Sequence, residues 1–203
     1  MYRANIRTAG FTLIEVIIVL AISGALAVGL LNRYSITQRR ARFTAAVEQT
    51  VARLDGFRNE TSSSYVPGGD GGAAGGLGSD SQVFLGRLVT FNVNSSTLTV
   101  ATLVADNTDV RANVQTSGSA NTFTIPWGVT IASATSFNQI LFSREPASGL
   151  NNTYVMQGTD LNNNSNYNDD GTVTIRLRSD NSAYLADIVI DAQTGSVNRS
   201  YLN

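Results

Sequence analysis

The sequence predicts an α+β fold in which one long N-terminal helix packs on a C-terminal antiparallel β domain. An apolar run over residues 11–31 continues as an amphipathic stretch to about residue 60, and no proline interrupts it. The glycine-rich segment "PGGDGGAAGGLGSDS" follows at residues 67–81. After it come short segments rich in Val, Ile, Thr and aromatic residues, separated by Gly, Asn and Asp, which is the pattern of β-strands and turns.

The composition excludes several catalytic classes. The 203 residues include no His and no Cys, so the chain cannot form a Ser-His-Asp or Cys-His catalytic group of its own. The formal net charge is −1, and every basic residue is Arg. A chain this close to neutrality has neither the basic excess of a nucleic-acid-binding protein nor a strongly acidic surface.

The predicted helix has two halves that follow a short polar leader, residues 1–10. Residues 11–31 would span about 31 Å as a helix, which matches one hydrocarbon core, so this half should face lipid or other helices. Residues 32–60 are amphipathic and should pack on the β domain. The apolar stripe predicted for this packing comprises Ile36, Phe43, Val47, Val51, Leu54 and Phe57.

The glycine-rich stretch separates the helix from the β domain. We predict a flexible loop at residues 61–81, and it is not a phosphate-binding loop because it lacks a Gly-Lys-Ser/Thr ending. Residues 82–203 then form the β domain. In "TVTIRLR" the residues Val173, Ile175 and Leu177 alternate with polar ones, which predicts a strand with one buried face. The expected strands are "SQVFLGRLVTF", "STLTVATLVA", "NTFTIPWGVTI", "NQILFSR", "NTYVMQG", "GTVTIRLR", "YLADIVIDA" and "SVNRSYL".

The residue that most needs explanation is Glu15, a carboxylate four residues into the apolar run. A secretory signal peptide cut after Ala27 would explain the apolar run, but an acid is unfavourable in its hydrophobic region and the helical pattern continues past the cut. An ordinary membrane anchor also gives the acid no role, although an ionised side chain inside a membrane is costly.

A third interpretation gives Glu15 a partner. Cleavage between Gly10 and Phe11 would create a new α-amine four residues before Glu15. In a staggered bundle of identical helices, the amine of one subunit can approach Glu15 of its neighbour. Such a pair would compensate two buried charges and fix the axial register, as single buried polar residues do in coiled coils.

The segment Gly10-Phe11-Thr12-Leu13-Ile14-Glu15 closely resembles the type IV prepilin signature of pilins and type II secretion pseudopilins. The resemblance implies cleavage after Gly10 by a prepilin peptidase, N-methylation of Phe11 and a role for Glu15 in subunit docking. It also implies a single-pass protein of the inner membrane whose globular domain lies outside the cytoplasm. Arg residues flank both ends of the apolar run, so the positive-inside rule does not by itself choose that orientation.

The C-terminal pattern narrows the resemblance. The segments "IPWGVTI", "NQILFSREPASG", "TVTIRLR" and "ADIVIDAQTGSVN" follow in an order similar to that of the H-type minor pseudopilins and their minor-pilin relatives. The resemblance implies a structural subunit of a secretion pseudopilus or a type IV pilus, with other pilins as partners. Some relatives bind DNA through a basic C-terminal turn. Residues 195–199 carry one arginine, Arg199, which argues against a nucleic-acid partner.

Two alternatives belong to other functional classes. One is an adhesive or DNA-binding subunit at a pilus tip. The other is a membrane-tethered enzyme acting on envelope polymers, in which an acid pair such as Asp160 and Asp169 would serve as in a glycosidase. An enzyme on an ordinary anchor would not need Gly10, Phe11 and Glu15 together, so we expect no catalytic residues.

The segment "DLNNNSNYNDDG" at residues 160–171 is a weak candidate for calcium. Its oxygen-bearing side chains suit Ca²⁺, but its spacing does not fit an EF-hand, and a surface turn explains the same composition. We therefore expect no obligatory cofactor. The candidate calcium ligands are Asp160, Asn162, Asn164 and Asp169.

Overall fold

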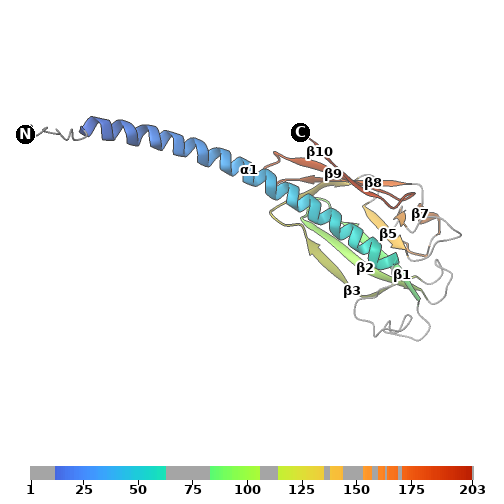
Figure 1. Cartoon of the computed structure of the whole chain (residues 1–203). Coiled ribbons are helices and arrows are strands. Elements are labelled where there is room, and N and C mark those ends of the chain that lie inside the picture. The colour runs from blue at the N-terminus through green and yellow to red at the C-terminus, as the bar shows by residue number, and fades with distance from the viewer. Residues whose placement is uncertain are drawn as a thin grey trace, which may run out of the picture. The chain divides into compact units, whose positions relative to one another are not determined.

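A computed structural model describes residues 12–62, 83–105, 114–134, 138–143, 153–156, 160–162, 164–168 and 171–202. The chain divides into two units, Met1–Ala41 and Arg42–Asn203. Helix α1 (Leu13–Ser62) begins in the first unit and ends in the second, where its last turns run along the strands (Figure 1). The predicted α+β fold, a long helix packed on an antiparallel β domain, is confirmed.

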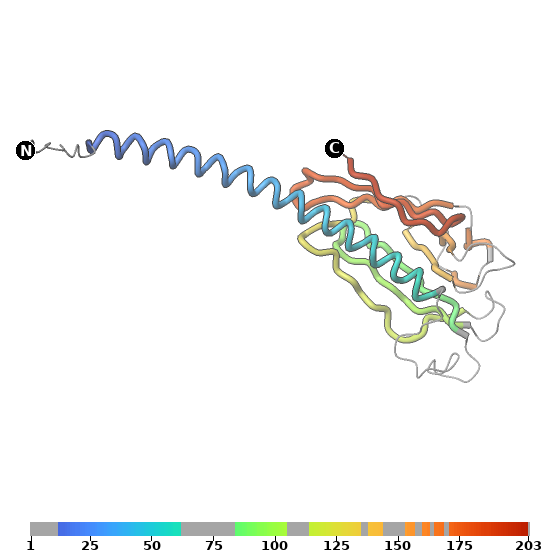
Figure 2. Tube along the Cα trace, viewed as in Figure 1, coloured from blue at the N-terminus to red at the C-terminus, as the bar shows by residue number. Residues whose placement is uncertain are grey.

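The strands of the second unit form two antiparallel sheets. One has the order β3-β2-β1-β5-β6-β7 and the other has the order β10-β9-β8-β4. The chain path between them can be followed in Figure 2. The strands are β1 (Val83–Phe91), β2 (Thr97–Ala105), β3 (Gln115–Thr124), β4 (Thr130–Ala134), β5 (Gln139–Ser143), β6 (Thr153–Met156), β7 (Tyr167–Asn168), β8 (Thr172–Arg178), β9 (Leu185–Asp191) and β10 (Val197–Leu202).

The main core joins the second half of α1 to both sheets. The helix contributes buried side chains at three- and four-residue spacing, which places them on one face. Phe43 also stacks on Tyr184, with ring centroids 5.9 Å apart. The predicted stripe is therefore buried at Phe43, Val47, Val51, Leu54 and Phe57. Ile36 was wrongly included in it, because it is 52% exposed and belongs to the first unit.

The strongest strand prediction is confirmed by the pairing of β8 with β9. Val173, Ile175 and Leu177 are buried and lie opposite Ile190, Ile188 and Ala186. The other face of the pair carries polar residues. There Arg176 lies opposite Asp187, and its Nε and Nη2 atoms each donate to a carboxylate oxygen at 2.8 Å. This hydrogen-bonded pair raises the pKa of Arg176 further above its usual range.

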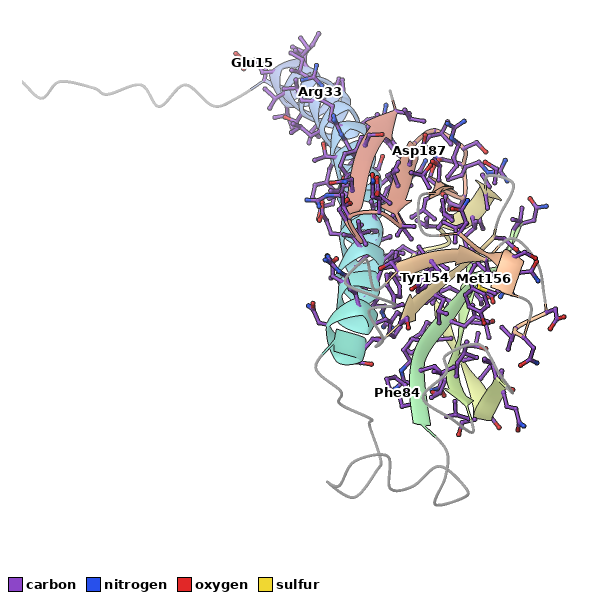
Figure 3. The ribbon with its side chains drawn as sticks, turned by 90° about the vertical axis from the view of Figure 1, so that its right-hand side faces the viewer. Glu15, Arg33, Phe84, Tyr154, Met156 and Asp187 are labelled. Carbon is purple, nitrogen blue, oxygen red and sulfur yellow. The ribbon has the colours of Figure 1, made fainter. Side chains whose placement is uncertain are left out.

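A smaller second core lies on the opposite face of the six-stranded sheet. Neighbouring residues of one strand alternate between the two cores, as Ile140 and Leu141 do in β5. Tyr154 and Met156 of β6 belong to this second core and are labelled in Figure 3. Its buried members are Leu85, Leu88, Leu103, Val114, Leu141, Tyr154 and Met156.

Some predicted boundaries were wrong. The segment at residues 121–131 is not one strand, because β3 ends at Thr124 and β4 begins at Thr130. Pro126 cannot donate a ladder hydrogen bond, and Trp127 and Gly128 have φ values of 59° and 70°. The loop also begins later than expected: Thr61 is buried in the last turn of α1 and donates to the Phe57 carbonyl at 2.7 Å. The rest of the predicted loop lies outside the described residues.

Candidate processing and assembly site

Glu15, labelled in Figure 3, lies in the first turn of α1. There it closes a capping interaction with Thr12. The backbone N–H of Thr12 donates to Glu15 Oε2 at 2.9 Å, and the Thr12 hydroxyl donates to the same oxygen at 3.0 Å. In return the backbone N–H of Glu15 lies 3.4 Å from the Thr12 hydroxyl oxygen. This is the reciprocal arrangement of a capping box, which satisfies backbone donors that the first helical turn leaves without partners.

The capping role of Glu15 was missed in the sequence, although a signal was there. Thr12-Leu13-Ile14-Glu15 fits the Ser/Thr-x-x-Glu pattern that precedes an apolar helix. The carboxylate therefore already has hydrogen-bond donors within its own chain. A partner amine would have to compete with, or add to, the hydrogen bonds from Thr12. The predicted cleavage residues Gly10 and Phe11 lie outside the described residues.

The first unit exposes an apolar surface along α1. Its large hydrophobic side chains are exposed from Leu13, at 80%, to Leu31, at 68%. By length and composition this helix can cross a membrane. Gly24 and Gly29 lie within it, and apart from the adjacent residues and the backbone of the helix itself no atom stands within 4 Å of the position that a Cβ would take at either residue. The surface therefore has the character of a segment that lipid or another apolar helix covers.

Glu48 of α1 joins the helix to the C-terminal strand of the second unit. Its Oε1 atom lies 2.6 Å from Arg199 Nε and accepts a hydrogen bond from the Tyr201 hydroxyl at 3.0 Å. Arg199 and Tyr201 are two apart on β10, so their side chains leave the same face of the strand. Partial burial raises the pKa of Tyr201, and the hydrogen bond to Glu48 raises it further. Arg199, the arginine considered above for nucleic-acid contact, therefore lies on β10 and is paired within the chain.

Asp160 and Asn162, two of the calcium candidates, form hydrogen bonds within the chain. Asp160 Oδ1 accepts from the Asn162 backbone N–H at 3.0 Å, as in an Asx turn. Asn162 Oδ1 accepts from the backbone N–H of Val114 at 2.6 Å, and Val114 is buried in the second core. Asn164 belongs to a short 3₁₀ turn, η2 (Asn164–Asn166), whereas Asp169 lies outside the described residues, as does the acid pair it would form with Asp160. Among the described residues no three His, Cys, Asp or Glu side chains gather as a metal site.

The comparisons with known proteins give one match. A family model described as the prokaryotic N-terminal methylation motif matches residues 6–31, a span that includes Gly10, Phe11 and Glu15. Searches of curated proteins and of solved structures gave no match. The motif points to a structural rather than a catalytic protein and is consistent with a single-pass membrane anchor. It implies a substrate of prepilin peptidase that assembles with other pilin subunits, and so supports a type IV pilin-like protein.

Proposed function

We propose that this chain is a minor pilin or pseudopilin of the H type, a structural subunit of a type II secretion pseudopilus or a type IV pilus. The observation that carries the proposal is the methylation motif at residues 6–31 followed by the exposed apolar half of α1. A peptidase cuts after Gly10, and the new terminus at Phe11 is methylated. The precursor crosses the inner membrane once, with the β domain outside the cytoplasm.

Assembly then exchanges lipid for protein around the apolar half of α1. Inside a filament its exposed Leu, Ile and Val side chains contact the same segment of neighbouring subunits. Glu15 sets the axial register between neighbouring subunits, because its carboxylate meets the Phe11 amine of a neighbour at only one axial offset. The capping bonds from Thr12 hold the carboxylate at the helix end, where that amine arrives.

The test of this function is the natural N-terminus. We expect mass spectrometry of the native protein to find a chain that begins with N-methylated Phe11. In a Gly10→Val variant the uncleaved precursor should accumulate, because a side chain at the cleavage position obstructs the peptidase. Its N-terminus should be Met1, or Tyr2 where the initiator methionine has been removed. A native chain that keeps residues 1–10, or one cut after Ala27, would contradict the proposal.

We also propose that the hydrogen-bonded residues Asp160 and Asn162 form a structural turn that holds no metal. Adding a chelator should leave the melting temperature of the protein unchanged. Asn162→Ala should lower the stability by about 1 kcal/mol, because the backbone N–H of Val114 loses its acceptor next to the second core. Thermal unfolding of the wild type and of Asn162→Ala, each with and without chelator, measures these effects. A drop in melting temperature on chelation, abolished by Asn162→Ala, would restore the calcium interpretation.

A further inference from the structure

Three arginines follow the apolar part of α1 within the first unit. Arg33, Arg39 and Arg40, which we call the basic collar, are all exposed in the first unit. No acidic residue occurs between Glu15 and Glu48. Within the described part of the chain, the ion pairs involve other arginines, so the collar is a net positive surface with no acidic residue between Glu15 and Glu48 to neutralise it.

If residues 11–31 span a membrane, the basic collar lies along the helix axis at the level of the membrane surface. The apolar run ends at Leu31, and Arg33 lies about 3 Å further along the helix axis, within the headgroup layer of about 5 to 8 Å. Tyr34 is exposed beside it, where an amphipathic ring suits the interface. Arg39 and Arg40 lie about 12 to 14 Å beyond Leu31, from where long side chains reach back toward the phosphates.

The distribution of the collar around the helix favours lipid over a single protein surface. Arg33 and Arg40 are seven residues apart and share one side of the helix, whereas Arg39 lies about 100° away from Arg40. One flat protein surface would face only part of this collar, but headgroups surround an emerging helix on every side. Phosphate groups also match the forked donors of a guanidinium.

We propose that the basic collar binds anionic phospholipid headgroups of the leaflet from which α1 emerges. The lipid-binding proposal depends on one part of the proposed function, namely that α1 crosses a membrane. In the proposed orientation that leaflet is the outer one of the inner membrane, so the collar holds the unassembled subunit among anionic lipids. It also accounts for basic residues on the side that the positive-inside rule disfavours. Each arginine near an anionic surface contributes about a fivefold preference, equivalent to about 1 kcal/mol.

The experiment uses the full chain reconstituted in vesicles of phosphatidylcholine with one-fifth phosphatidylglycerol. The protein is extracted with its surrounding lipids in a styrene–maleic acid copolymer, and the phosphatidylglycerol fraction is compared with that of the bulk membrane. We expect the lipids around the wild type to contain more phosphatidylglycerol than the bulk membrane. In a variant with all three collar residues changed to Gln, this excess of phosphatidylglycerol should fall by at least about twofold. The same three residues changed to Lys should retain most of the excess, and high salt should reduce it.

Arg178→Gln is the matched control, because it removes an exposed arginine of the β domain and leaves the collar intact. Equal enrichment around the wild type and the triple Gln variant would overturn the proposal. Chemical crosslinking of the same samples tests whether the collar contacts a second copy of the chain instead. If the triple Gln variant kept its phosphatidylglycerol enrichment but formed fewer crosslinked dimers, the proposal would be overturned and the collar would be a contact between two copies. Resistance of the protein to alkaline extraction is measured in parallel. If alkaline extraction released the protein, α1 would not span the membrane, and the proposed function would be contradicted. This measurement therefore separates the proposed membrane span from the proposed lipid binding of the collar.

Discussion

Glu15→Gln will give a chain that inserts into the membrane and loses its leader normally but is recovered poorly in filaments. In the precursor no amine exists at Phe11, so neither insertion nor cleavage depends on the charge of residue 15. In the proposed filament the neighbour's amine is buried in the helix bundle, and removing its counter-charge would cost about 3 to 5 kcal/mol. We therefore expect recovery in filaments to fall by about tenfold or more.

The capping box makes this substitution unusually informative. Glutamine at this position still serves a capping box, so Glu15→Gln removes the charge and keeps the geometry of the first turn. Thr12→Val does the opposite, because it removes the hydroxyl that bonds Glu15 and leaves the carboxylate in place. Loss of a cap costs about 1 kcal/mol at the end of one helix, so Thr12→Val should reduce recovery only slightly. Glu15→Asp should be intermediate, because the charge stays while the side chain shortens.

Recovery is measured as the protein found in sheared filaments or tip complexes, divided by the processed chain in the membrane. A defect in both Glu15→Gln and Thr12→Val would show that the first helical turn, rather than the charge, limits assembly. Equal recovery for Glu15→Gln and the wild type would remove the carboxylate from the assembly mechanism altogether.

The sequence predicts those parts of the fold in which one face is buried. Val47, Val51 and Leu54 repeat with helical spacing, and Val173, Ile175 and Leu177 repeat with strand spacing, because each set packs on the main core. The motif at Gly10, Phe11 and Glu15 is likewise local in the chain. These features depend on neighbours within a few residues, which is the information that a single sequence carries.

The first half of β3 shows where this reasoning fails. Its residues "QTSGSAN" are almost entirely exposed and mostly polar on both faces, since β3 is one of the two edge strands of the six-stranded sheet. No alternation of apolar and polar residues therefore marks it as a strand. Its pairing with β2 supplies the backbone hydrogen bonds that define it.

The contacts of Glu48 could not be predicted for a different reason. Tyr201 lies 153 residues away from it in sequence, and only the packing of α1 beside β10 brings them together. The capping role of Glu15, by contrast, was available from the Thr-x-x-Glu spacing. It was missed because a carboxylate in an apolar run suggested an intermolecular partner before an intrachain one.

The second large effect is expected at Gly86, in the middle of the β domain. Strand β1 is paired on both sides, and Gly86 lies opposite Leu103 of β2 and Ser143 of β5. A Cβ atom built on Gly86 would overlap the backbone carbonyl oxygen of Phe142, and it would lie 3.0 Å from the Ser143 Cα. Gly86→Ala will therefore lower the stability by about 3 kcal/mol or more, equivalent to a fall in melting temperature of about 10 °C.

Gly56→Ala is the matched control for this substitution. Gly56 lies in α1, and apart from the adjacent residues and the backbone of the helix itself no atom stands within 4 Å of the position that its Cβ would take. Alanine is favoured over glycine in a helix by about 1 kcal/mol, so this variant should melt slightly above the wild type. The readout is thermal unfolding of the full chain in detergent, followed by the fluorescence of Trp127, the only tryptophan and a residue of the β domain.

The cause of the Gly86 effect is steric, because the overlapping atom belongs to the backbone of β5. A side chain could turn away, but Phe142 can move its carbonyl only by distorting the β1–β5 pairing, which lies between the two cores. A melting temperature for Gly86→Ala within a degree of the wild type would show that the two strands are not this close. Because Gly86 lies in the β domain and Glu15 in the apolar helix, the two variants should fail differently. Gly86→Ala should reduce the amount of folded protein, whereas Glu15→Gln should leave folded, processed subunits that do not enter the filament.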